Sequence, residues 1–309
     1  GMYCPSWAVG EGRDKFKAAV RDDYALYLKK LSVPTDTVWI NWEGHPWIKS
    51  DGWSTATKGD ESYCFCPRCK TEFAKYSKLP PEEIEKAWPG DIIQKHKDTW
   101  VRFRSWQHAQ LVLTLESAAA EVGKTVGKDS HFVSEVHNSL TYKSNKAYGE
   151  YDARDMLGRM PVLELWGPYL FSQFSYPYSY KPGAHLRYLS VVAQGREYAD
   201  EHSKQGGVRT KIIEFPHGLQ CADWILEPEA IVMEHLSCFL TGWDGSIVYF
   251  FPYGYDAMYW RAMADANTLT AQSEDFVFDG KKISGGDKFK AAAATPVPRM
   301  ARRNTWTEE

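Results

Sequence analysis

The stretch "VWINWEGHPW" at residues 38–47 decides the fold. It begins with β-branched and aromatic residues, which are typical of a buried strand. Glu43 follows directly and stands among tryptophans. In parallel sheets and barrels, polar side chains at the carboxyl ends of strands form the ligand sites. The stretch therefore predicts a strand that presents a carboxylate at its carboxyl end, and that carboxylate needs a partner.

The rest of the chain alternates between expected helices and strands. The helices are expected at 14–31, 91–122, 184–207, 228–242 and 256–272, and the strands at 37–43, 131–138, 161–167, 209–218 and 245–254. This alternation predicts a parallel α/β sheet with right-handed crossovers. No glycine-rich phosphate loop follows a strand, so a (β/α) TIM-type barrel fits better than a nucleotide-binding sheet.

One barrel domain is expected over residues 1–275, with an irregular cysteine-rich insertion at 44–90 and a C-terminal extension of unknown structure at 276–309. Five strand–helix units are recognisable, and five strands do not close the usual eight-stranded barrel. We therefore expect an incomplete barrel, or one completed by segments that the pattern does not reveal. An open sheet edge would leave backbone groups unpaired, which favours a homo-oligomer.

Composition narrows the class of partner. The 309 residues have a net charge of −3, so they offer no basic surface for nucleic acid. No apolar run approaches the ~18 residues of a membrane span. Aromatic residues make up 15% of the chain, which fits packing against sugar rings, although a large aromatic core would explain the same content. We expect a carbohydrate substrate, and neither nucleic acid nor a membrane.

The partner of Glu43 is expected at the end of another strand. Glu214 in "KIIEFPHG" has the same placement, after apolar residues and before a turn with proline and glycine. A retaining glycosidase holds two such carboxyl groups about 5–5.5 Å apart. Each glutamate could instead form a structural ion pair, and Glu135 and Glu164 compete because they also lie in expected strands.

Three of the six cysteines, Cys64, Cys66 and Cys69, crowd into "CFCPRC". This spacing favours a metal, and Cys4 would add a fourth thiolate. Four thiolates form a closed tetrahedral zinc site with a structural role. The alternative is reduced thiols without a metal. The localisation stays unknown: a reduced cluster slightly favours the cytoplasm, and a signal peptide could have been trimmed from this sequence.

Seven segments, in order along the chain, resemble the later part of the glycoside hydrolase family 42 β-galactosidases. They are "MYCPSW" (2–7), "VWINWEG" (38–44), "YCFCPRCKTEFAKY" (63–76), "VHN" (136–138), "LELWGPY" (163–169), "IIEFPHG" (212–218) and "GSIVYFFPYG" (245–254). The resemblance implies a retaining enzyme with Glu43 as acid/base, Glu214 as nucleophile and zinc on the cysteine loop. The expected substrate-binding residues are Asn41, Trp42, Trp47, Asn138, Trp166, Tyr169 and Tyr253.

The chain departs from that family where Trp42 replaces the asparagine before the acid/base, and where Gly167 and Pro168 replace Asp-Asn. The family's first three strand–helix units would precede Cys4 and are absent from the sequence. We predict a retaining glycoside hydrolase that acts on a small β-glycoside or oligosaccharide, such as a β-galactoside. The departures favour the alternative of a catalytically inactive carbohydrate-binding barrel. The cysteine loop alone would also fit a zinc-stapled interaction module.

Overall fold

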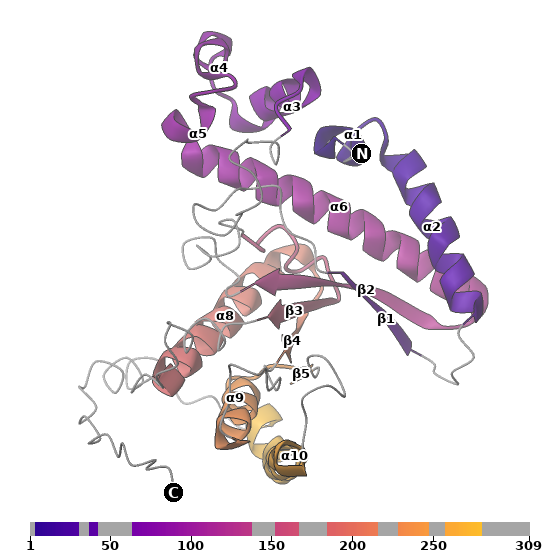
Figure 1. Ribbon diagram of the computed structural model, residues 1–309, viewed down its shortest axis with the longest axis vertical. Helices are drawn as coiled ribbons and strands as arrows, with labels where there is room; N and C mark the ends of the chain where they lie inside the picture. Colours follow the sequence, from indigo (N-terminus) through magenta and orange to yellow (C-terminus); the bar gives the residue numbers. More distant parts are fainter. Residues whose placement is uncertain are drawn as a thin grey trace, which may run out of the picture. The chain divides into compact units, whose positions relative to one another are not determined.

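The computed structural model describes residues 4–30, 37–42, 64–137, 152–166, 184–215, 228–246 and 257–279. The chain divides into two compact units. One unit comprises residues 1–167, 195–215 and 243–247 and holds the sheet. The other comprises residues 168–194, 216–242 and 248–309 and holds the last two helices (Figure 1).

Five parallel strands form one sheet, in the same order as along the chain. They are β1 (Thr37–Trp42), β2 (Asp129–His137), β3 (Val162–Trp166), β4 (Lys211–Phe215) and β5 (Gly245–Ser246). The order never reverses, so every connection steps the same way, whereas a nucleotide-binding sheet reverses at its switch point. The parallel α/β sheet is as expected, and its closure into a barrel stays a prediction.

The described helices include the five that the sequence predicts and four shorter ones, α1, α3, α4 and α5, that it does not. They are α1 (Pro5–Val9), α2 (Arg13–Lys30), α3 (Pro67–Ser77), α4 (Pro81–Ala87), α5 (Ile92–Lys95), α6 (Lys97–Val126), α8 (Ala184–Gly206), α9 (Pro228–Leu240) and α10 (Ala257–Phe278). The expected stop of α6 at Gly123 is wrong. The helix continues to Val126 and ends at Gly127, which has a left-handed φ of 71°. None of the helices described is both long and apolar enough to cross a membrane.

The described part of the expected irregular insertion contains two helices, α3 and α4. Pro67 and Pro81 begin them, each at the first helical position, where the missing N–H has no intrahelical partner to lose. α3 buries Cys69 and Phe73 completely. The expectation of an irregular segment is therefore wrong for residues 64–90, because Pro67 and Pro81 begin helices there rather than loops.

Helix α6 is the scaffold of the first unit. It contacts α1, α2, α3 and β2 (Figure 1). Glu116 of α6 accepts hydrogen bonds from the backbone N–H of Phe132, at 2.6 Å, and pairs with Nδ1 of His131, at 2.9 Å. One long helix thus connects the sheet to the segments that carry the cysteines.

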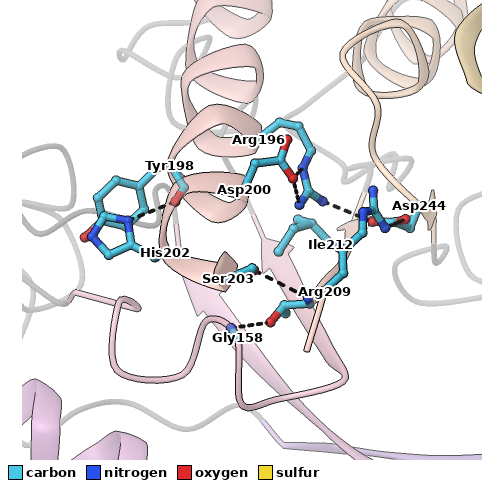
Figure 2. Close-up of polar contacts among 10 residues, drawn as sticks. Gly158, Arg196, Tyr198, Asp200, His202, Ser203, Arg209, Ile212 and Asp244 are labelled. Carbon is cyan, nitrogen blue, oxygen red and sulfur yellow. Dashed lines mark hydrogen bonds and ion pairs between the residues drawn. The ribbon is translucent and has the colours of Figure 1, made fainter. Parts of the chain in front are cut away.

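A network of ion pairs fixes the beginnings of β4 and β5 against α8 (Figure 2). Arg196 is 1% exposed and donates from Nη1 to Oδ2 of Asp244 at 3.1 Å. The same oxygen accepts from the backbone N–H of Ile212 at 2.9 Å. Arg196 also pairs with Asp200 on its own helix, and Arg209 pairs with Asp244. The carboxylate of Asp244 therefore joins three segments of the chain.

In the second unit, α9 and α10 pack against each other. Cys238 and Phe239 of α9 and Tyr259, Ala262 and Ala266 of α10 are buried. These buried residues form the described contact face of the two helices, while Trp260 of α10 and Leu240 of α9 are exposed.

Candidate metal centre

Four cysteines converge in the first unit. The sulfur atoms of Cys4, Cys64, Cys66 and Cys69 all lie within 4.8 Å of one another. Cys4 precedes α1, and the other three lie at the beginning of α3. These segments meet because α1 and α3 contact each other and both contact α6. The expected grouping of the four cysteines is confirmed.

The distances between the sulfur atoms fit a shared cation. Sγ of Cys4 lies 3.4 Å from Sγ of Cys66 and 3.8 Å from Sγ of Cys69. Four ~2.3 Å bonds to a tetrahedral zinc ion place the sulfur atoms about 3.8 Å apart. A disulfide needs about 2.05 Å, and all four cysteines are free. The four sulfur atoms therefore lie close enough together to bind one metal ion.

Helix beginnings position two of the sulfur atoms. Cys66 is the N-cap residue of α3 and Cys4 is the N-cap residue of α1, each followed by a proline. The carbonyl of Cys66 accepts a hydrogen bond from the N–H of Lys70 at 3.1 Å. The unpaired N–H groups of the first turn of α3 carry partial positive charge, which favours a thiolate there.

The thiols differ in acidity when no cation is present. Burial raises the pKa of the Cys4 and Cys64 thiols above the usual value. Burial acts in the same direction on Cys66, but hydrogen bonds from the N–H of Cys69 and from the neighbouring cysteine side chains lower its pKa to about 7. Cys66 therefore ionises more readily than Cys4 and Cys64, and a bound divalent cation would favour the thiolate form of all four.

A buried arginine lies beside the cluster. Arg104 of α6 is 0% exposed, and its Nη1 lies 3.7 Å from Sγ of Cys69. Its Nη2 donates to the carbonyl oxygen of Cys64 at 2.7 Å. The guanidinium carbon lies 4.3 Å from the centre of the Trp100 ring. Burial lowers the pKa of this guanidinium, and the negative charge of Cys69 and Cys64 acts to raise it.

A hydrogen-bonded chain extends from Arg104 to the cluster. Arg104 donates from Nη1 to Oε1 of Gln107 at 2.7 Å, and Nε2 of Gln107 donates to Oγ of Ser6 at 2.7 Å. Ser6 in turn donates to Sγ of Cys69 at 3.2 Å. Sequence reasoning missed these three residues. The available signal was a pair of polar residues, Arg104 and Gln107, that lie one helical turn apart on a face of α6 that is buried.

Aromatic packing fixes the other side of the cysteine loop. Phe65, between two of the cysteines, stacks on Trp100 with ring centres 5.0 Å apart and meets the edge of Trp88 at 5.3 Å. Nε1 of Trp88 donates to the carbonyl of Phe65 at 3.2 Å. Trp100 belongs to a buried cluster with Phe73 and Phe103, and Trp88 packs against this cluster. The loop is therefore held by packing and polar contacts even before a cation binds.

The expected catalytic and sugar-binding residues are described in part, by their backbone alone. Glu214 is the fourth residue of β4, in register with Leu165 of β3 and Ser246 of β5. Trp166 ends β3, in register with Phe215. Asn41 and Trp42 end β1. The remaining expected residues, which are Glu43, Trp47, Asn138, Tyr169 and Tyr253, lie outside the described residues.

One competing carboxylate is described in full. Glu164 of β3 is 0% exposed, and the register places it beside Glu135 of β2. Its position inside the strand, two residues before the carboxyl end at Trp166, makes it a buried residue of the sheet rather than one of the strand end.

The fold and the cysteine geometry define an α/β protein with a parallel sheet and a four-cysteine cluster suited to a metal ion. No protein-family model matches the chain, and no curated protein matches it.

Proposed function

We propose that the protein is a retaining glycoside hydrolase whose four-cysteine cluster binds one structural zinc ion. The substrate class is a small β-glycoside or oligosaccharide, such as a β-galactoside. The observation that carries the proposal is that a glutamate follows β1 directly in the sequence and a second glutamate lies near the end of β4 in the same parallel sheet. Glu43 is the residue directly after β1, and Glu214 is the penultimate residue of β4. Glu214 lies near the carboxyl edge, where parallel strands place ligand sites, and we expect Glu43 to follow β1 to the same edge.

The two glutamates would divide the chemistry between them. Glu43 protonates the departing glycosidic oxygen, and Glu214 attacks the anomeric carbon to form a glycosyl–enzyme bond. Glu43 then removes a proton from the water that hydrolyses this intermediate. These roles follow the resemblance to the β-galactosidases, in which the corresponding strands carry the acid/base and the nucleophile.

The sheet must curve for this pair to act together. β1 and β4 are three strand steps apart in the sheet order. Neighbouring strands are ~4.8 Å apart, so a flat sheet would separate their ends by about 14 Å. Retaining chemistry needs about 5–5.5 Å between the carboxyl groups. The proposed mechanism therefore requires the barrel-like curvature that the uniform order of the strands allows.

The zinc ion would have a structural role. Four thiolates complete a tetrahedral site and leave no position for water or substrate. An all-sulfur tetrahedral set suits zinc better than the hard cations, which prefer oxygen ligands. The ion would tie the beginning of α1 to the beginning of α3, and so hold the segment that follows β1 against α6.

The enzymatic proposal is tested with a panel of aryl glycosides. We expect turnover of at least one β-glycoside, and loss of turnover in Glu214→Gln. A 2-deoxy-2-fluoro glycoside of the same sugar should label Glu214 covalently, which mass spectrometry of the peptide detects. Sugar binding without turnover would indicate the inactive carbohydrate-binding barrel. If the protein neither binds nor hydrolyses any sugar of the panel, the zinc-stapled interaction module is the hypothesis that remains.

The metal proposal is tested separately by elemental analysis of protein purified without added metal. We expect about one zinc per chain, and loss of the zinc in a variant with Cys66→Ser and Cys69→Ser. Cobalt substitution should give the intense visible bands of a tetrahedral four-sulfur site. A zinc content near zero together with no cobalt bands would contradict the proposal.

A further inference from the structure

We propose that Arg104 is the counter-charge of the metal centre and, with Gln107 and Ser6, positions Cys69 for metal binding. This inference rests on the zinc site of the proposed function. It assigns to three residues outside the ligand set a role in metal affinity, in addition to their contribution to packing.

Arg104 carries a positive charge that is buried. A buried cation needs a compensating negative charge, or burial becomes strongly unfavourable. The described hydrogen bonds of Arg104 go to a sulfur atom, a carbonyl oxygen and an amide oxygen, and none goes to a carboxylate. Within the described part of the chain, the negative charge beside Arg104 is therefore that of the cysteine cluster, whose Cys69 sulfur lies 3.7 Å from Nη1.

The metal centre, in turn, needs a positive charge beside it. A divalent cation with four thiolates carries two negative charges in excess. The cluster is partly buried, and Cys69 is 0% exposed, so water screens little of that charge. A guanidinium at hydrogen-bonding distance from a ligand sulfur lowers the free energy of the bound state more than that of the neutral thiols.

The hydrogen bonds supply the positioning. Cys69 accepts from Arg104 of α6 and from Ser6 of α1, and Gln107 bridges these two donors. Arg104 also holds the carbonyl of Cys64. Donors of this kind orient metal ligands and tune their basicity, and their loss typically weakens metal binding 10–100-fold. Both ends of the three-cysteine loop are thus fixed from the same arginine.

A purely structural role for Arg104 predicts a different outcome. The guanidinium packs over the rings of Trp100 and Phe103, at 4.3 and 5.5 Å from their centres. If this packing were the whole role, Arg104→Met would retain most of the contact area and leave the metal affinity unchanged.

The experiment compares Arg104→Met with Arg68→Met in the full chain. Arg68 lies in the first turn of α3, between Cys66 and Cys69, but its side chain is 57% exposed and pairs with Glu11. Zinc affinity is measured by competition with a chromophoric chelator. We expect a 10–100-fold loss for Arg104→Met, a smaller loss for Arg104→Lys, and a change of less than about threefold for Arg68→Met.

A spectroscopic readout separates positioning from packing. In the cobalt-substituted protein, the sulfur-to-cobalt charge-transfer band should move to lower energy in Arg104→Met, because Cys69 donates more readily once it accepts fewer hydrogen bonds. Ser6→Ala should shift the band in the same direction by a smaller amount. Circular dichroism of each variant establishes whether it is folded.

The outcomes are distinct. If wild type binds zinc while Arg104→Met and Arg68→Met have equal affinities, the inference is wrong and the zinc site stands. If Arg104→Met does not fold, the zinc affinities and cobalt spectra of Arg104→Lys and Ser6→Ala are compared with those of wild type. Affinities and spectra equal to wild type in both variants would overturn the inference. If wild type binds neither zinc nor cobalt, the proposed metal site itself has failed.

Discussion

Asp244 is a single side chain on which several buried polar groups depend. Its carboxylate accepts hydrogen bonds from the 1%-exposed Arg196 and from the backbone N–H of Ile212, and it pairs with Arg209. Its own N–H donates to the carbonyl of Ile212 at 2.9 Å. Removing the carboxylate would leave a buried guanidinium and a backbone donor with fewer partners, and such losses are among the largest that single substitutions cause.

We therefore predict that Asp244→Ala lowers the free energy of unfolding by about 3–5 kcal/mol. Asp200→Ala is the matched control, since Asp200 also pairs with Arg196 but its side chain is 44% exposed. Water can replace an exposed partner, so we expect a loss of about 1 kcal/mol or less in the control. Urea denaturation of both variants at neutral pH measures the difference. Equal losses of unfolding free energy in the two variants would show that Asp244 stabilises Arg196 no more than Asp200 does.

The sequence predicts some of these residues and not others, for a physical reason. Cys64, Cys66 and Cys69 are recognisable because their spacing is local, and a metal needs its ligands close together. Arg104 and Asp244 find their partners in segments that are distant along the chain. No local pattern indicates which segments the fold brings beside them, so their roles appear only in three dimensions.

Elements follow their hydrophobic period where they are long. α2, α6, α8, α9 and α10 and the strands were predictable because apolar residues in the sequence recur at the period of a helix or as short apolar runs. α3 and α4 span 11 and 7 residues. They were missed because the prolines and cysteines around them indicate loops when the sequence is read alone. The boundary at Gly123 failed because a contact, not a turn, explains that glycine: a Cβ there would lie 2.7 Å from Cβ of Ser130.

The pair of helices α9 and α10 should respond to pH through His235. Burial lowers the pKa of His235 below its usual value of about 6.5, and a hydrogen bond with Asn267 of α10 opposes this only in part. The folded state therefore binds the proton less tightly than the unfolded state. Its contribution to stability is complete above about pH 6.5 and is lost as the pH falls through the folded-state pKa.

We predict that the free energy of unfolding of wild type falls as the pH is lowered from about 6.5 to 5, and that His235→Gln reduces this fall. Glutamine keeps a side chain that can bond to Asn267 but does not titrate. Urea denaturation at several pH values measures both proteins, with the difference between them plotted against pH. A difference that stays constant over this range would contradict the assignment to His235.

For the whole molecule, the informative feature is the order of the strands. Alternation of helices and strands predicted a parallel sheet, and the five strands are parallel and follow the chain order. Curvature could not be predicted in the same way, because it depends on the twist of each strand pair and on the packing of side chains across the sheet. Whether β1 and β4 approach each other is a property of the complete sheet and of no single segment.

The distance between Glu43 and Glu214 therefore tests the whole molecule as well as the mechanism. In a curved sheet we expect about 5–5.5 Å between the two carboxyl groups in a crystal structure, as retaining chemistry requires. About 6.5–9.5 Å would instead indicate inversion, and about 14 Å would mean a flat sheet in which the pair cannot act together.

The kinetics of two variants test the roles of Glu43 and Glu214 independently of the distance. Glu43→Ala should still form the glycosyl–enzyme with an aryl glycoside whose leaving group needs no proton, and added azide should speed the second step, whereas Glu214→Ala should be inactive on every substrate. Wild-type rates in both variants, on a substrate that the parent hydrolyses, would contradict the assignment. If the parent hydrolyses nothing, we expect Trp42→Asn to restore some activity, because an asparagine next to the acid/base would hold the 2-hydroxyl of the sugar in the transition state.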